Sequence, residues 1–170
     1  MSSPIELEEV YDQHAQALFA YLLNLTRDEQ DTRDALQELF IKLARQPDLL
    51  TQARDPRAFL IRLAHNAAID LMRRHDARAR SHARFGAELI SQFTPSADPD
   101  EQAFRLELAN ALGELPAEQR AVVHLKLWEG LTFEQIAEIL EIPVNTGASR
   151  YRYGLDKLRS LLRPLYEEIK

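Results

Sequence analysis

Residues 131–162 contain two helical periodicities separated by a proline, and this arrangement constrains the fold more than any other feature of the chain. Thr132 and Gln135 have the spacing of a capping box, which predicts that a helix begins there. Pro143 should end this helix, because proline has no backbone N–H and clashes with the preceding turn. A second helix should follow, since apolar residues recur at 3.6-residue spacing. These residues are Val144, Gly147, Tyr151, Leu155, Leu158 and Leu162. The segment therefore predicts a helix-turn-helix.

The other side of the second predicted helix is polar and basic. It carries Asn145, Ser149, Arg152 and Asp156, flanked by Arg150, Tyr153 and Arg159. Such side chains suit the major groove of DNA, where short polar and basic groups reach the base edges. The alternative interpretation of the pattern is a solvated helix face.

The composition indicates an all-α protein. The 170 residues are rich in helix formers, include only five glycines and show no convincing strand alternation. The absence of cysteine excludes disulfides, thiolate metal sites and a cysteine nucleophile. The five histidines have no ligand spacing, and there is no glycine-rich phosphate loop, so we expect no enzyme, metal or cofactor. No apolar run reaches the length of a membrane span, and the N-terminus is unlike a signal peptide, which favours a cytoplasmic protein without membrane insertion.

The net charge of −6 argues against nucleic acid as a partner, but the distribution of charge argues for it. Residues 1–53 have ten acidic and four basic side chains, a net charge of −6. Residues 54–84 have eight Arg and three Asp, a net charge of +5, and residues 144–163 have a net charge of +4. Either basic segment alone would fit a solvated helix face. Together, with one of them inside a helix-turn-helix, they indicate a nucleic-acid-binding protein.

Caps and prolines divide the chain into further helices. A Ser-Pro pair with a following Glu predicts a helix that starts at Pro4 and runs to about Leu25. A second helix is expected over about residues 29–45, and Asp55 followed by Pro56 predicts the start of a third.

Two small helical domains joined by a flexible linker are expected. Residues 91–100 are polar, contain two prolines and have no periodicity, as is typical of a linker. The domains are then residues 1–90 and residues 101–170, the second of which contains the helix-turn-helix. Further helices are expected over about 99–113 and 116–128.

Three stretches of the sequence, in this order, resemble those of a known family. They are DTRDALQELFIKL at residues 31–43, PRAFLIRLAHNAAIDLMRR at residues 56–74, and residues 111–162. The last stretch has Leu-Pro before a helix, Glu-Gly-Leu before the first helix of the helix-turn-helix, and Ile-Ala-Glu-Ile-Leu within that helix. Over nearly its whole length the chain resembles the bacterial extracytoplasmic-function (ECF) RNA polymerase sigma factors.

The resemblance implies a subunit that gives core RNA polymerase its promoter specificity. Residues 31–43 resemble the family's clamp-binding helix, so the clamp region of the polymerase's largest subunit would contact Asp34, Gln37, Glu38 and Phe40. Phe40 would be a partly exposed apolar anchor with polar neighbours. The alternative is that Phe40 is a core residue and the acidic side chains are merely solvated.

Residues 56–74 resemble the family's promoter-melting helix, which meets the −10 element. The residues expected to bind DNA there are Arg62, His65, Asn66, Asp70, Arg73 and Arg74. Melted DNA exposes base edges and phosphates that Arg, Asn and His can bind. For Asn66 and Asp70 the alternative is an i,i+4 pair on the helix surface. Arg73 and Arg74 are expected to contact phosphates.

The second helix of the helix-turn-helix resembles the family's reader of the −35 element. The residues expected to bind DNA there are Ser149, Arg150, Arg152, Tyr153 and Lys157. Arg152 could bond a guanine edge with both ends of its guanidinium, whereas Arg150 and Lys157 lie further around the helix, where phosphates are expected. Tyr151 and Trp128 are expected to pack inward.

Gly147 and Ala148 depart from the family's pattern, which favours valine followed by a basic residue. A glycine inside a helix costs about 1 kcal/mol relative to alanine. Two alternatives remain: a sigma-like mimic that binds an anti-sigma factor without DNA, and an ordinary helix-turn-helix transcriptional regulator. The retained arginines argue against the first, and the clamp-like stretch argues against the second. The resemblance also implies an anti-sigma factor as a partner.

Overall fold

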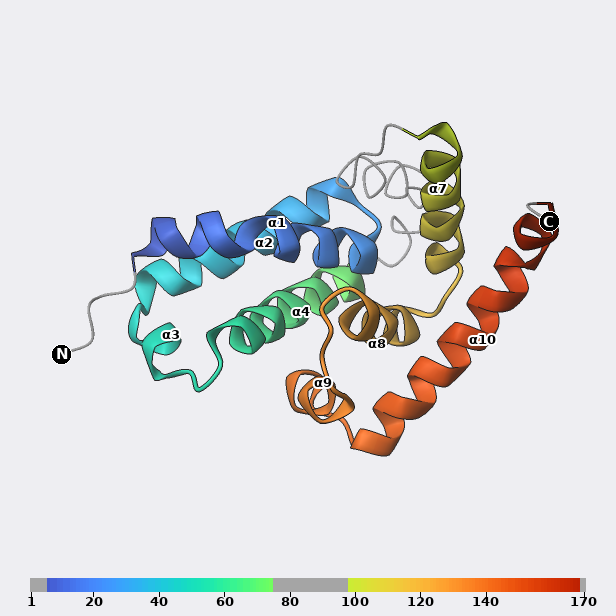
Figure 1. Ribbon diagram of the computed structural model, residues 1–170. Helices are drawn as coiled ribbons and strands as arrows, with labels where there is room; N and C mark the ends of the chain where they lie inside the picture. The colour runs from blue at the N-terminus through green and yellow to red at the C-terminus, as the bar shows by residue number, and fades with distance from the viewer. Residues whose placement is uncertain (1–5, 75–97, 169–170) are drawn as a thin grey trace.

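The computed structural model describes residues 6–74 and 98–168, and every regular element in these two ranges is an α-helix (Figure 1). The first range, here called the N-terminal half, holds α1 (Leu7–Thr26), α2 (Glu29–Arg45), α3 (Asp48–Gln52) and α4 (Pro56–Arg74). The second, the C-terminal half, holds α7 (Pro99–Gly113), α8 (Ala117–Leu127), α9 (Phe133–Leu140) and α10 (Val144–Glu168). The all-α fold expected from the sequence is confirmed.

Local capping explains where the functional helices begin. At α4, the carboxylate of Asp55 accepts a hydrogen bond from the N–H of Ala58 at 3.2 Å. At α9, the full capping box is present: Thr132 Oγ1 accepts from the N–H of Gln135 at 3.1 Å, and Gln135 Oε1 accepts from the N–H of Thr132 at 2.9 Å. Pro143 separates α9 from α10. The helix-turn-helix predicted from these residues is therefore confirmed.

Other boundaries differ from the expectation. Helix α1 begins at Leu7 and not at Pro4, because Glu6 has extended backbone angles, with φ −70° and ψ 123°. The short helix α3 is not expected from the sequence. Most of the expected linker lies outside the described residues, and its Asp98 caps α7 by accepting from the N–H of Asp100 at 2.9 Å. The domain limits themselves stay a prediction.

Helices α1, α2 and α4 pack together and enclose the core of the N-terminal half (Figure 1). Tyr21, Leu22, Leu39, Leu43 and Leu60 are almost completely buried there. This packing leaves one side of α2 and the outer side of α4 available for partners.

The two halves share one apolar core. Helix α8 lies against α1, and α9 lies against α4. Leu125, Leu131 and Ile136 of the C-terminal half belong to the same buried cluster as Leu25 and Ile61 of the N-terminal half. Helix α10 crosses α8 and continues past α7 (Figure 1). The halves are thus in direct contact instead of standing apart.

Candidate nucleic-acid interface

Helix α10 presents two of the predicted DNA readers to solvent. Arg152 is exposed, and its guanidinium lies over the ring of Tyr153, 5.3 Å from the centroid. Tyr153 is 58% exposed, so it does not pack inward. The cation–π contact leaves both side chains exposed on the outer side of α10.

The other predicted residues of α10 contact the chain itself. Arg150 is half-buried, and its Nη2 lies 3.5 Å from Oε2 of Glu118. Lys157 Nζ donates to the carbonyl of Glu114 at 2.9 Å. Ser149 is half-buried. To bind phosphates, Arg150 would have to leave Glu118, and Lys157 would have to leave the carbonyl of Glu114.

The inner side of α10 packs against α8 and α9 and sets the orientation of the helix. As expected, Tyr151 turns inward, with its ring edge-on to Phe133 at 5.5 Å. Gly154 is buried where α10 crosses α8, and a Cβ atom at this position would lie only 2.8 Å from Cγ2 of Val123. Gly154 is therefore required for the close crossing that orients the predicted readers.

Four of the six residues predicted to bind the −10 element are exposed on the outer side of α4. They are Asn66, Asp70, Arg73 and Arg74. Arg73 and Arg74 occupy the last turn of the helix, where cations are favoured by the helix dipole. Arg62, the fifth, is only half-exposed and forms an ion pair with Glu141, directly after α9. This ion pair joins the two halves.

His65 points into the protein. Its Nδ1 is 2.8 Å from the hydroxyl of Tyr21, which is 1% exposed. Burial, with a smaller contribution from the positive charge of Arg150, lowers the pKa of His65 from 6.5 to about 4. The imidazole is therefore neutral at physiological pH, and it links α4 to α1 through Tyr21. Its predicted contact with DNA stays a prediction.

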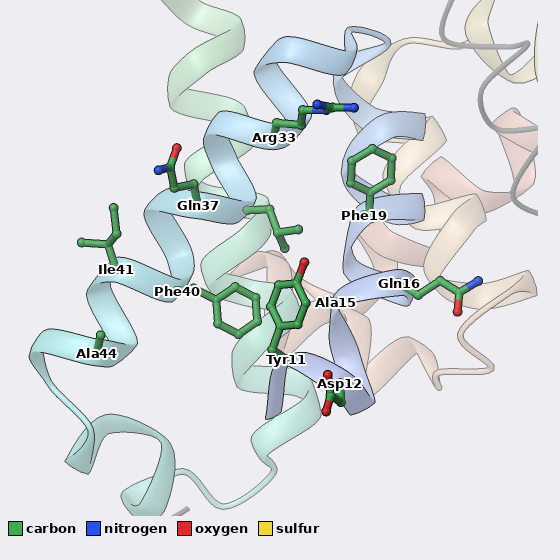
Figure 2. A pocket seen from close by; sticks show the side chains of 11 residues that line it. Tyr11, Asp12, Ala15, Gln16, Phe19, Arg33, Gln37, Phe40, Ile41 and Ala44 are labelled. Carbon is green, nitrogen blue, oxygen red and sulfur yellow. The ribbon is translucent and has the colours of Figure 1, made fainter. Parts of the chain in front are cut away.

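A groove between α1 and α2 contains part of the predicted polymerase-binding residues (Figure 2). Its volume is about 920 Å³. Figure 2 shows Phe40 of α2 beside Tyr11 of α1, and their rings meet edge-to-face with centroids 5.1 Å apart. Gln37 also lines the groove, and Ile41 is 43% exposed at its edge. An exposed apolar groove with polar neighbours is typical of a protein-docking surface.

The two other predicted polymerase-binding residues lie outside the groove lining. Asp34 is exposed and its Oδ1 accepts from Nε2 of Gln30 at 2.9 Å, one turn earlier on α2. Glu38 is exposed on the same helix. Both side chains are exposed on α2, and their predicted contact with the polymerase stays a prediction.

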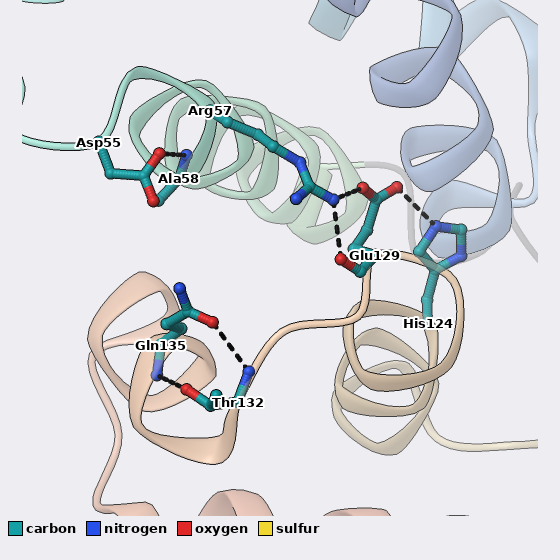
Figure 3. A network of polar contacts seen from close by, with 7 residues as sticks. All are labelled: Asp55, Arg57, Ala58, His124, Glu129, Thr132 and Gln135. Atoms are coloured by element: carbon teal, nitrogen blue, oxygen red, sulfur yellow. Dashed lines mark hydrogen bonds and ion pairs between the residues drawn. The ribbon is translucent and has the colours of Figure 1, made fainter.

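A polar network joins the two halves between α4 and the end of α8 (Figure 3). Nη2 of Arg57, in the first turn of α4, donates to the backbone carbonyl of Glu129 at 2.8 Å and also to its carboxylate. On the other side, the Glu129 carboxylate is 3.8 Å from Nε2 of His124, whose Nδ1 is 3.0 Å from the side-chain amide of Asn24. The contact with His124, and then the hydrogen bond from Arg57, lower the pKa of Glu129.

Comparison with known proteins assigns the family. The model described as Sigma-70 region 2 matches residues 10–78, and the one described as Sigma-70, region 4 matches residues 105–158. The ECF RNA polymerase sigma factor SigL of Mycobacterium tuberculosis is 35% identical over 163 residues, which is 94% of this chain and 90% of that protein. The chain belongs to the ECF sigma factors.

A second curated relative and one solved structure are also similar to this chain. SigX of Bacillus subtilis, also an ECF sigma factor, is 26% identical over 94% of this chain and 85% of that protein. The sigma factor RpoE of Bartonella quintana, solved in complex with the anti-sigma factor NepR, superposes with a TM-score of 0.70 at 21% identity. The match covers 92% of this sigma factor and 96% of the RpoE chain, and it shows a common fold.

Sequence reasoning about this sigma factor missed three residues that organise the interface. Gly154 had a signal, since a glycine inside a helix often marks a close packing contact. Arg57 and Glu129 had none, because they are 72 residues apart and only the packing of the halves brings them together. The expectation that Trp128 is a core residue is wrong. Trp128 caps the C-terminus of α8, where its ring covers His124 at 5.4 Å and stays 48% exposed.

Two findings concern other classes of site. Among the described residues, no three His, Asp or Glu side chains are grouped so that they could hold a metal ion. Within the same residues, no helix has both the length and the apolar content that a membrane span needs.

Proposed function

We propose that this sigma factor binds core RNA polymerase through α2 and the α1–α2 groove, and binds promoter DNA at the −10 element through α4 and at the −35 element through α10. The observation that carries the proposal is the alignment with ECF sigma factors, which runs through both regions and nearly the full length of both chains. The exposed side chains of α2, α4 and α10 supply chemistry suited to these three partners.

At the −35 element, Arg152 would read a guanine edge in the major groove and Tyr153 would pack beside it. Ser149 is placed one turn earlier and would contact the base edge or the adjoining phosphate. Arg150 and Lys157 would bind phosphates on either side of the groove. Phosphate contacts set the register of the helix, and the Arg152 contact sets the sequence choice.

At the −10 element, the exposed amide of Asn66 and the carboxylate of Asp70 would bond to bases of the melted strand. Arg73 and Arg74 would bind phosphates beyond them, because they lie in the exposed last turn of α4. Arg62 would join this surface only after leaving Glu141. Melted single strands suit such a site because their base edges are free.

At the polymerase, Phe40 would be the apolar anchor, with Gln37, Asp34 and Glu38 setting the orientation of the bound clamp. An apolar side chain that enters a partner's pocket typically contributes more to affinity than the polar residues around it.

The direct test is run-off transcription with core polymerase, purified protein and the DNA upstream of its own operon. Transcripts that require both the core enzyme and this protein are the expected result. Absence of any transcript, together with tight binding to an anti-sigma factor, would instead favour a sigma mimic that does not use DNA.

We further propose that the protein acts in the cytoplasm and is held inactive by an anti-sigma factor. The support is the family and the RpoE neighbour, whose structure includes such a partner. Adding a cognate anti-sigma factor to the run-off reaction should abolish the transcript, and a transcript of unchanged intensity would contradict this assignment.

A further inference from the structure

The first turn of α10 carries an exposed asparagine that the proposed contacts to the −35 element do not use. Asn145 is the second residue of the helix and is exposed, and its neighbour Val144 is 40% exposed. The end of α10 that follows α9 lies at the edge of the molecule (Figure 1). In helix-turn-helix proteins, the N-terminal residues of the recognition helix contact base edges. Asn145 is therefore at the position where a base-reading side chain is expected.

Helix capping does not account for this asparagine. Helix α10 begins at Val144, so Pro143 occupies the N-cap position and Asn145 lies inside the first turn. The side chain that caps the N-terminus of a helix is the one at the N-cap position. Inside a helix, asparagine is one of the less favourable residues, because its side chain competes for backbone hydrogen bonds. The exposed amide of Asn145 therefore contributes little to the stability of α10.

Asn145 and Arg152 lie on the same face of α10. Their positions differ by seven residues, which is close to two full turns of an α-helix. The axial distance between them is about 10 Å at 1.5 Å per residue, and successive base pairs of B-DNA are about 3.4 Å apart. Because a recognition helix is tilted in the groove, the two side chains would meet bases about two to three base pairs apart.

The side chains between these two residues are small. Ala148 and Ser149 occupy the intervening turn, and both are half-buried. Neither would hold α10 away from the floor of the groove. The short amide of Asn145 can then reach a base edge at the N-terminal end of the helix, while the long side chain of Arg152 spans the wider gap further along. This difference in length fits a recognition helix that enters the major groove with its N-terminus first.

We propose that Asn145 is a further specificity-determining residue of this sigma factor, and that it selects an adenine about two to three base pairs from the guanine read by Arg152. The carboxamide of asparagine accepts a hydrogen bond from the N6 amino group of adenine and donates one to N7, and adenine alone offers this pair in the major groove. The inference rests on the proposed function, because it extends the reading of the −35 element by α10.

Transcription from a promoter library tests the proposal. The full chain and core polymerase would transcribe templates that are randomised across the −35 element and carry a barcode in the transcribed part. With the wild type, one position should favour adenine by about five- to a hundredfold, the range that a bidentate contact gives. N145A should reduce this preference to less than about twofold and keep the guanine preference, which also shows that the variant is folded. R152A should have the reverse effect. N145D should change the preferred base to cytosine, whose N4 amino group donates to a carboxylate.

The matched control is N110D, the same change at an exposed asparagine of α7, which should keep the base preferences of the wild type. An adenine preference that survives in N145A, or that is missing from the wild type, would overturn the proposal. So would positions affected by N145A and R152A that coincide or lie more than about four base pairs apart. Failure of the proposed function would look different, because the wild type would then give no core-dependent transcript from any template.

Discussion

The two glycines of α10 should respond in opposite directions to the same substitution. At Gly154, the Cβ of alanine would lie 2.8 Å from Cγ2 of Val123 and 3.6 Å from Cβ of Gln119. Val123 is completely buried and β-branched, so it cannot rotate away. Adding a methyl group to such a site costs up to about 3 kcal/mol. The better helix propensity of alanine returns about 1 kcal/mol, so G154A should lose about 2 kcal/mol.

At Gly147, the same methyl group would meet only Cδ1 of Ile142, at the ordinary contact distance of 3.7 Å. Because no steric clash offsets the higher helix propensity of alanine, G147A should be about 1 kcal/mol more stable than the wild type. For a chain of this size, the melting temperature should fall by roughly 4–8 °C for G154A and rise by roughly 2–4 °C for G147A.

Thermal and urea unfolding would measure the stability of both variants relative to the wild type. The double variant G154A/V123A serves as an internal check. Removing the Val123 methyl groups should recover part of the loss caused by G154A, so that the two changes are not additive. A G154A protein as stable as G147A would refute the close crossing of α8 and α10, and with it the argument for how the recognition helix is oriented.

Three further predictions concern function and pH. R152A should lose about 1–3 kcal/mol of preference for the favoured −35 sequence over a scrambled one, and unchanged promoter choice would remove Arg152 from the readers. F40A should weaken binding to core polymerase, measured by titration of labelled protein; unimpaired binding would return Phe40 to a purely structural role. Because the pKa of His65 is lowered to about 4 in the folded state, stability should fall by about 3 kcal/mol as the pH drops from 6.5 to 4, and H65Q should flatten this limb of the unfolding profile.

Local signals predicted the helices of this protein well. The capping box of Thr132 and Gln135, the break at Pro143 and the cap at Asp55 each act through atoms a few residues apart, and each is present as expected. The start of α1 was placed too early, because a favourable Ser-Pro pair does not decide whether the following backbone is already helical.

The sites were harder to predict, because solvent exposure depends on tertiary packing. The family resemblance assigned His65 and Arg62 to the DNA-binding side of α4. In the structure, His65 instead contacts Tyr21 of α1, and Arg62 forms an ion pair with Glu141 after α9. Trp128 was expected to pack inward, but its position at the end of α8 leaves it half-exposed. Arg152 and Tyr153 combine a predicted role with an exposed position, as do the four exposed residues of α4, namely Asn66, Asp70, Arg73 and Arg74.

The central claim is that one chain binds both promoter elements within a single polymerase complex. Footprinting of the promoter upstream of its own operon, with permanganate to detect melted thymines, tests this most directly. With core polymerase and this protein together, the account predicts protection at the −35 element and reactive thymines at the −10 element on the same DNA, and neither with core polymerase alone. Protection at −35 without melting at −10, or a footprint that does not need core polymerase, would contradict it.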